Sequence, residues 1–154
     1  MKKIMISVDD TKGTREMFSK IDKICKCMNP DEVILLYVEK LEGRSLMDEM
    51  LGDAEMSTLK ESLEGTEFKE ALDKKADAIL TYYKKSLESR PPVPIVKTVV
   101  RTGHPAEEII QGAEEEGADM IIIGSRGKRI GRMFMGSVSR EVANNSTVPT
   151  LLVK

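Results

Sequence analysis

Short, uninterrupted apolar runs are the feature that most restricts what this chain can fold into. Four of them are rich in β-branched and aliphatic residues: KIMISV at 3–8, EVILLYV at 32–38, DMIIIG at 119–124 and TLLV at 150–153. Because they lack the polar alternation of a half-exposed sheet, they are typical of parallel strands that are buried on both faces. A fifth run, IVKTVVR at 95–101, includes Lys97 and Thr98, and we expect it nearer an edge of the sheet.

The segments between these runs have the apolar period of helices. Helical faces are indicated within 17–28, 72–87, 106–113 and 138–143. Asn29-Pro30-Asp31 follows the first face, Pro91-Pro92 the second and Asn144-Asn145 the fourth. Strands that alternate with helices predict βαβ crossovers. The expected fold is therefore α/β: one domain over 1–154 with an open parallel five-stranded sheet and helices on both faces.

The stretch from 41 to 71 does not fit this alternation. Its apolar residues are spread among charges and three glycines, so periodicity assigns no element to it. We interpret the stretch as an amphipathic and loosely ordered connection. A partly helical segment and a surface for a protein partner are the alternatives.

Composition excludes several classes of protein. The chain has 24 Lys plus Arg against 26 Asp plus Glu, without the basic excess of a general nucleic-acid binder. Its apolar runs are far shorter than the roughly 20 residues that cross a bilayer, and Asp9 interrupts any signal-peptide core. We therefore expect a cytoplasmic protein with no nucleic-acid and no membrane partner. His104 is the only histidine, which excludes multi-histidine metal sites and argues against a catalytic triad.

A glycine-rich segment, GSRGKRIGRMFMGSVS at 124–139, directly follows the apolar run MIII. In an open parallel sheet, ligands bind beyond the carboxyl ends of the strands, where this segment is expected to lie. Glycines let a backbone approach an anion, and Gly136 with Ser137 can open a helix whose first amides favour phosphate. Ser137 and Ser139 add hydroxyl donors, and the segment carries four cations: Arg126, Lys128, Arg129 and Arg132. The alternative is a tight turn with solvated cations.

Asp9 stands at the end of the first predicted strand, in ISVDD. A carboxylate at this place can accept hydrogen bonds from ribose hydroxyls or from a base amine. Capping of the following helix is the alternative role, which Asp10 or Thr11 can also fill.

These residues resemble the universal stress protein family. GSRG followed by GSVS is similar to its signature of Gly, two residues, Gly, nine residues, and Gly with Ser or Thr. The spacer between Gly127 and Gly136 has eight residues here, and we expect the exposed turn at 128–132 to absorb the difference. The likeness continues in ISVDD, EVILLYVE, RTGHPAEEIIQGAEEEGADMIIIGSRG and VPTLLVK, which together span nearly the whole chain outside 41–71.

The resemblance implies a Rossmann-like sheet of order 3-2-1-4-5, often in a homodimer formed through the last strand. In the ATP-binding branch, the residue matching Asp9 contacts the nucleoside, backbone near Val38 lies by the adenine, and the glycine loop holds the phosphates. Carried over by position, the binding residues are Ser7, Val8, Asp9, Val38, Ile123, Gly124, Arg126, Gly127, Gly136, Ser137, Val138 and Ser139.

The resulting hypothesis is a stress-response regulator that binds ATP, with or without Mg or Mn, or another adenine nucleotide, and that recognises an unidentified protein partner. Efficient catalysis is not indicated, because the chain lacks a GxxxxGK[ST] loop and an evident carboxylate pair beside the glycine segment. A slow ATPase and a protein-interaction module with a decayed nucleotide site are the alternatives.

Overall fold

Five parallel strands form the sheet of the computed structural model, which describes residues 2–40, 58, 61–62, 65–89, 91, 94–125 and 135–154. The strands are β1 (Lys3–Ser7), β2 (Glu32–Glu39), β3 (Ile95–Thr102), β4 (Met120–Gly124) and β5 (Thr150–Val153). Their order is β3-β2-β1-β4-β5, with every neighbouring pair parallel. The expected strand order is thus confirmed, and the run with Lys97 and Thr98 is an edge strand as predicted.

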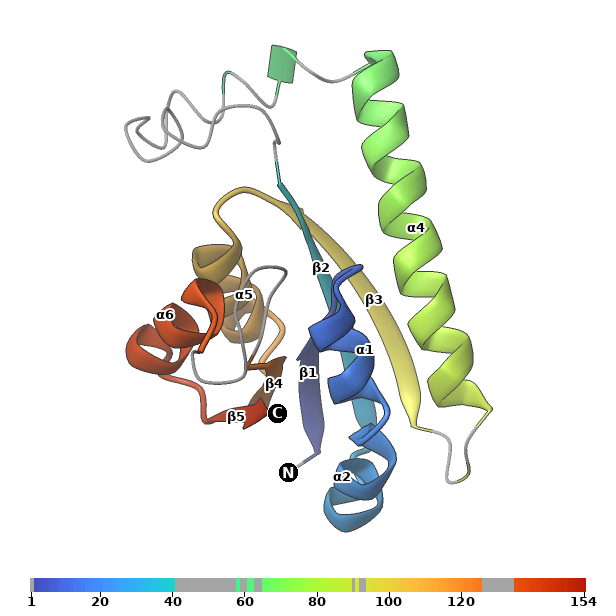
Figure 1. Cartoon of the computed structure of the whole chain (residues 1–154), viewed down its shortest axis with the longest axis vertical. Coiled ribbons are helices and arrows are strands. Elements are labelled where there is room, and N and C mark those ends of the chain that lie inside the picture. The colour runs from blue at the N-terminus through green and yellow to red at the C-terminus, as the bar shows by residue number, and fades with distance from the viewer. Residues whose placement is uncertain are drawn as a thin grey trace.

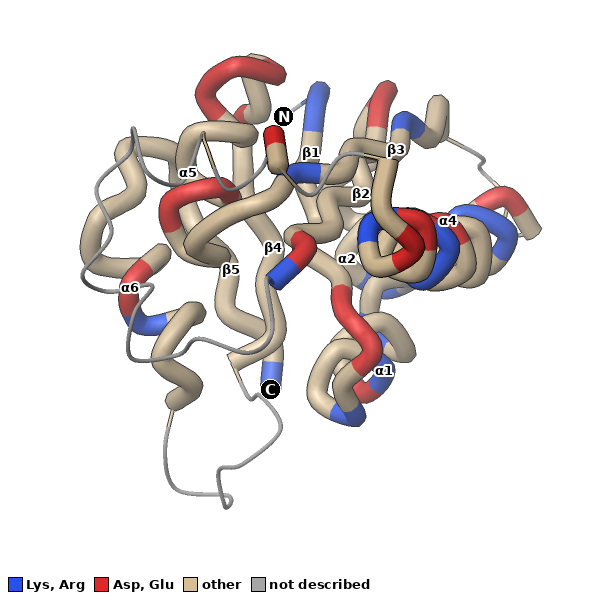
Figure 2. Tube along the Cα trace, turned by 90° about the horizontal axis from the view of Figure 1, so that it is seen from above, with Lys and Arg blue, Asp and Glu red and all other residues tan. Residues whose placement is uncertain are grey.

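Helices cover both faces of this sheet, again as expected (Figures 1 and 2). One face carries α1 (Lys12–Phe18), α2 (Ile21–Met28) and the long α4 (Glu67–Glu88). The other face carries α5 (Pro105–Glu115) and α6 (Ser137–Asn145). Figure 2 shows cationic and acidic positions interspersed along α4. Within the described ranges, no helix is long and apolar enough to cross a membrane.

The apolar face at 17–28 belongs to two helices, where the sequence analysis treated it as one segment. Helix α1 ends at Phe18, with Ser19 as its C-cap donating its N–H to the Arg15 carbonyl, and α2 starts at Ile21 after its N-cap, Lys20. Helix α2 then ends at Asn29, which adopts a left-handed conformation with φ of 44°, as helix C-termini commonly do.

Two other helix boundaries differ from the predicted ones. Helix α4 begins at Glu67, inside the stretch 41–71, most of which lies outside the described residues. Thr66 caps α4 by accepting a hydrogen bond from the Lys69 N–H. Helix α6 continues through Asn144 and Asn145, which were expected to follow it.

The core is divided by the sheet into two apolar layers. Ile4, Ile6 and Leu35 face α1, α2 and α4, where the rings of Phe18 and Tyr83 lie 4.4 Å apart. Met5, Ile34 and Ile121 belong to the opposite layer, beneath α5 and α6. Burying one such side chain contributes about 1.5–3 kcal/mol. The sheet faces are thus occupied by packing, and polar groups gather where the strands end.

Candidate functional site

The carboxyl ends of β1 and β4 meet where the direction of strand succession reverses. From β1 the sheet continues through β2 to β3 on one side, and through β4 to β5 on the other. Ile6 pairs with Ile122, which brings Ser7 and Gly124 to the same edge. Such a switch point is the usual ligand crevice of an open α/β sheet.

Strand register brings several predicted site residues together at this edge. Val8 is buried, and its N–H continues the β1–β2 ladder by donating to the Leu36 carbonyl at 2.9 Å. Val38 and Ile123 are buried near the ends of the two flanking strands, β2 and β4. These residues lie around the end of β1, and their contact with a ligand stays a prediction.

Asp9 organises the turn from β1 into α1. Its Oδ1 accepts hydrogen bonds from the Thr11 N–H at 2.8 Å, the Thr11 hydroxyl at 2.6 Å and the Thr14 hydroxyl at 2.5 Å. Thr11 is the N-cap of α1 and accepts from the Thr14 N–H. Asp9 therefore braces the cap, and Thr11 is the cap itself. No described residue donates to Oδ2 of Asp9.

Tyr83 holds the same turn from the side of α4. Its hydroxyl donates to the Asp9 carbonyl at 3.2 Å. Burial, and then the negative charge of Asp9, raise the pKa of Tyr83 to about 12. The phenol consequently stays a neutral hydrogen-bond donor at ordinary pH. Asp10, next along the chain, forms an ion pair with Lys75 of α4 at 3.2 Å.

Among the described residues, the N-terminus of α6 has neither a side-chain cap nor an acid. Its N-cap is Gly136, which makes no side-chain capping bond, and its first turn holds no acid. By contrast, α4 and α5 each have two acids in the first turn. The first helical bond runs from the Arg140 N–H to the Gly136 carbonyl, so the three preceding amides have no acceptor within α6.

Hydrogen bonds join the two ends of the glycine segment. The Gly136 N–H donates to the Ser125 carbonyl at 2.9 Å, although the spacer is one residue shorter than the family pattern. Ser139 is buried, and its hydroxyl donates to the carbonyls of Gly136 and Ser125 at 3.0 and 3.4 Å. This hydroxyl therefore has a structural use, whereas the sequence analysis expected a donor to the ligand. Ser137 is exposed.

Part of the predicted glycine segment, 126–134, lies outside the described residues. Arg126 and Gly127 lie outside the described residues, as do the cations Lys128, Arg129 and Arg132. Their expected contacts with phosphate remain predictions.

A buried carboxylate, Glu39, was missed by the sequence analysis. Its side chain is fully buried at the end of β2, beside Val38. Oε2 accepts hydrogen bonds from Lys69 of α4 and Thr102 of β3, each at 2.9 Å, while Oε1 has no partner in the described part of the chain. Hydrogen bonds from Lys69 to Asp73 and then to Glu39 raise the pKa of Lys69. The only available signal was an acid that ends the apolar run EVILLYVE.

A sequence model of the universal stress protein family matches residues 1–154. The chain belongs to the universal stress protein family. Among curated family members, the universal stress protein MJ0577 of Methanocaldococcus jannaschii is 36% identical over 158 residues, which cover 99% of this chain and 94% of MJ0577. The solved structure of MJ0577 has a TM-score of 0.75 and 31% identity, covering 99% of this chain and 95% of that one.

More distant family members have the same fold. The Arabidopsis thaliana protein At3g01520, solved with AMP bound, has a TM-score of 0.67 and 17% identity, with 100% of this chain and 92% of that chain covered. A universal stress protein in complex with cAMP has a TM-score of 0.66 and 19% identity, with 99% and 97% covered. The family resemblance inferred from the sequence is confirmed by the family model and by the 36% identity with MJ0577.

Proposed function

We propose that this protein binds an adenine nucleotide, principally ATP, at the carboxyl edge of its sheet, and that nucleotide occupancy regulates its recognition of a protein partner in a stress response. The observation that carries the proposal is the N-terminus of α6, which has no side-chain cap among the described residues and is tied to the end of β4 by the hydrogen bond from Gly136 to Ser125. Two related proteins that were solved with AMP and with cAMP support the choice of an adenine nucleotide.

The first turn of α6 supplies the phosphate end of the proposed site. Three backbone N–H groups, from Ser137 to Ser139, converge at the positive end of the helix dipole. An acid in this turn would repel phosphate, and the turn contains none. Arg126 and Gly127 complete the phosphate loop in this proposal, and the nucleotide enters with Mg²⁺ or Mn²⁺ on its phosphates or without a metal.

The ends of β1 and β2 supply the nucleoside end. Oδ1 of Asp9 is occupied by the threonines of α1, which leaves Oδ2 to accept hydrogen bonds from ribose hydroxyls. Backbone at Val38 lies beside the base, and Ile123 and Gly124 border the sugar. A Cβ at Gly124 would lie 3.6 Å from the Gly13 carbonyl oxygen, an ordinary contact. Packing among the described residues thus leaves room for a Cβ atom there, and we attribute the glycine to the ligand.

Assembly through β5 completes the proposal. The protein forms a homodimer in which two copies of this edge strand meet, and it acts in the cytoplasm. The partner-binding surface includes the stretch 41–71.

Isothermal titration calorimetry with ATP, AMP and adenosine tests the proposed function. If α6 binds phosphate, ATP should bind at least tenfold more tightly than adenosine. A matched pair of variants sharpens this comparison: Ser137→Asp places a carboxylate in the exposed first turn, whereas Ser137→Ala removes only the hydroxyl.

Ser137→Asp should stabilise α6 slightly, because an acid suits a helix N-terminus, and yet should remove most of the phosphate-dependent affinity. Ser137→Ala should bind nearly as well as the parent. Equal binding of ATP and adenosine would refute the phosphate site. A protein that ignores every nucleotide would favour the protein-interaction module instead.

A further inference from the structure

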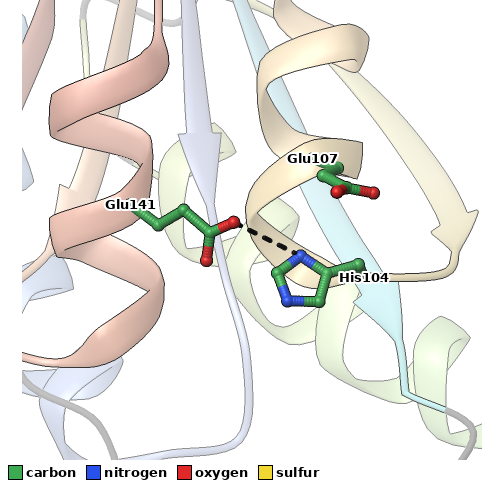
Figure 3. A group of neighbouring side chains, drawn as sticks. All are labelled: His104, Glu107 and Glu141. Atoms are coloured by element: carbon green, nitrogen blue, oxygen red, sulfur yellow. Dashed lines mark ion pairs between the residues drawn. The ribbon is translucent and has the colours of Figure 1, made fainter. Parts of the chain in front are cut away.

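We propose that His104, Glu107 and Glu141 form a binding site for a divalent transition-metal ion of the zinc type, on the face of the molecule where α5 and α6 lie side by side (Figure 3). None of the three is among the residues proposed to hold the nucleotide. The site therefore needs no nucleotide to bind its ion.

The fold brings these side chains together from two helices. His104 is the N-cap residue of α5, and Pro105 starts the helix in its first turn. Glu107 follows three residues after His104, a spacing that places both side chains on one side of the helix. Glu141 comes from α6 and precedes the buried Val142, which packs in the same apolar layer as Ala106. Packing between the two helices thus fixes the distance between the three backbone positions.

The distances suit a metal ion after small side-chain movements. One ligand atom from each residue lies within 4.8 Å of the others, and Nδ1 of His104 is 3.7 Å from Oε1 of Glu141. Tetrahedral zinc with bonds of about 2.1 Å requires ligand atoms about 3.4 Å apart. The side chains of His104 and Glu141 are 47% and 36% exposed. They can therefore move the short way that brings the ligand atoms to the spacing required by zinc.

The chemistry of the three groups selects the class of ion. One imidazole nitrogen and two carboxylate oxygens suit Zn²⁺ and its neighbours Co²⁺ and Ni²⁺, whereas Ca²⁺ and Mg²⁺ prefer oxygen ligands alone. Two carboxylates also match the charge of a divalent ion and offset the unfavourable positive end of α5. Three protein ligands leave at least one coordination position for water.

The surrounding contacts leave these groups available. His104 occupies the cap position, but its ring makes no capping hydrogen bond. The neighbouring carboxylate of Glu108 is bound elsewhere, since it pairs with Arg101 at 2.6 Å. Arg140, which precedes Glu141, donates to the Met135 carbonyl. The nearest charged neighbours along the helices are therefore engaged by other groups.

The sole histidine gives a direct experiment. The full chain is prepared with Cys25→Ala and Cys27→Ser, so that thiols cannot compete for metal, and with ¹⁵N-labelled histidine. Its single imidazole is followed by NMR while Zn²⁺ is added, and calorimetry gives the stoichiometry and affinity. We expect one ion per chain, a saturable shift of the His104 ring nitrogens, and a melting temperature that rises with Zn²⁺.

Variants assign the ligands. His104→Asn, Glu107→Gln and Glu141→Gln should each weaken Zn²⁺ binding at least tenfold, with melting temperatures close to the parent's when no metal is present, because these side chains are not in the core. Glu67→Gln is the matched control, since it removes an exposed first-turn acid from α4, and it should leave the affinity unchanged. An imidazole signal that ignores millimolar Zn²⁺, or equal affinity in His104→Asn and the parent, would overturn the proposal.

Discussion

At the residue scale, Asp9 holds the turn into α1 and is also the carboxylate that we propose to contact the nucleoside. Its Oδ1 accepts three hydrogen bonds from Thr11 and Thr14, whereas the sequence analysis saw binding and capping as alternatives. Because Asp9 belongs to the proposed nucleoside contact, we expect Asp9→Ala to weaken nucleotide binding. Three hydrogen bonds within the turn into α1 now imply a cost in stability as well.

Asp9→Ala should lower the free energy of unfolding by about 1–2 kcal/mol, the typical effect of losing a capping interaction. Urea denaturation of the protein without nucleotide measures this change. Asp10→Ala, at the adjacent position, is the control. It removes an ion pair with Lys75 at the surface and should lower the free energy of unfolding by less than about 1 kcal/mol. Equal losses in the two variants would show that Oδ1 does not brace α1.

The raised pKa of Tyr83 predicts that the free energy of unfolding changes with pH in the alkaline range. An unfolded tyrosine loses its proton near pH 10, while burial keeps the folded Tyr83 protonated until about pH 12. Between these values the folded state binds more protons, so stability falls as pH rises, by up to roughly 1.4 kcal/mol per pH unit.

Denaturation curves between pH 9 and 11 test this slope. Tyr83→Phe should be less stable than the parent at pH 9 but should lose less stability across the range. Tyr82→Phe changes an exposed ring and should keep the slope of the parent. If the free energy of unfolding of Tyr83→Phe fell with pH as steeply as that of the parent, groups other than Tyr83 would cause the pH dependence.

At the element scale, α4 is attached to the carboxyl edge by polar contacts as well as by apolar packing. Lys69 reaches Glu39 of β2, Lys75 reaches Asp10, and Tyr83 reaches Asp9. Glu39 is fully buried, while the Lys69 side chain is 27% exposed. The helix that covers β2 and β3 thus contacts the same strand ends that the proposed nucleotide would touch.

Lys69→Met should destabilise the protein by about 3 kcal/mol, because it leaves the buried carboxylate of Glu39 without its cation. Adding Glu39→Gln to this variant removes the buried charge and should recover at least about 1 kcal/mol. Asp73→Asn, which breaks only the exposed pair of Lys69, is the control and should cost little. If the double variant were no more stable than Lys69→Met, the charge of Glu39 would not be the cause.

The strands could be predicted from the sequence, and several local details could not. Continuous apolar runs identified β1, β2, β4 and β5, because burial on both faces leaves no polar alternation. The break between α1 and α2 was missed because both helices pack their apolar residues into one cluster, so the period continues across Ser19 and Lys20. The contact of Glu39 with Lys69 joins residues thirty positions apart, and only tertiary packing reveals it.

At the scale of the whole molecule, β5 is an edge strand, and no strand among the described residues pairs with its outer side. The Pro149 carbonyl accepts a hydrogen bond from the N–H of Ile121 in β4, and the Val153 carbonyl accepts one from the N–H of Ser125, which follows β4. Because alternate residues of a strand direct their backbone groups to opposite sides, the N–H of Leu152 points to the free edge. A second copy that pairs there would use this N–H.

Leu152→Pro removes the outward N–H and should convert the proposed dimer to a monomer, whereas Leu152→Ala shortens the same side chain and should remain dimeric. Light scattering coupled to size-exclusion chromatography distinguishes the 17.2 kDa chain from a particle of twice that mass. A dimeric Leu152→Pro variant would place the interface elsewhere.

The proposed position of the nucleotide, between α6 and the end of β1, can be tested by amide NMR during titration with ATP. The backbone N–H signals of Ser137, Val138 and Ser139 should shift most strongly, together with those around Asp9 and Gly124, while adenosine should leave the α6 signals nearly unchanged. Saturable shifts confined to other parts of the chain, or no shift at millimolar ATP, would contradict the claim that α6 and the end of β1 form the nucleotide site.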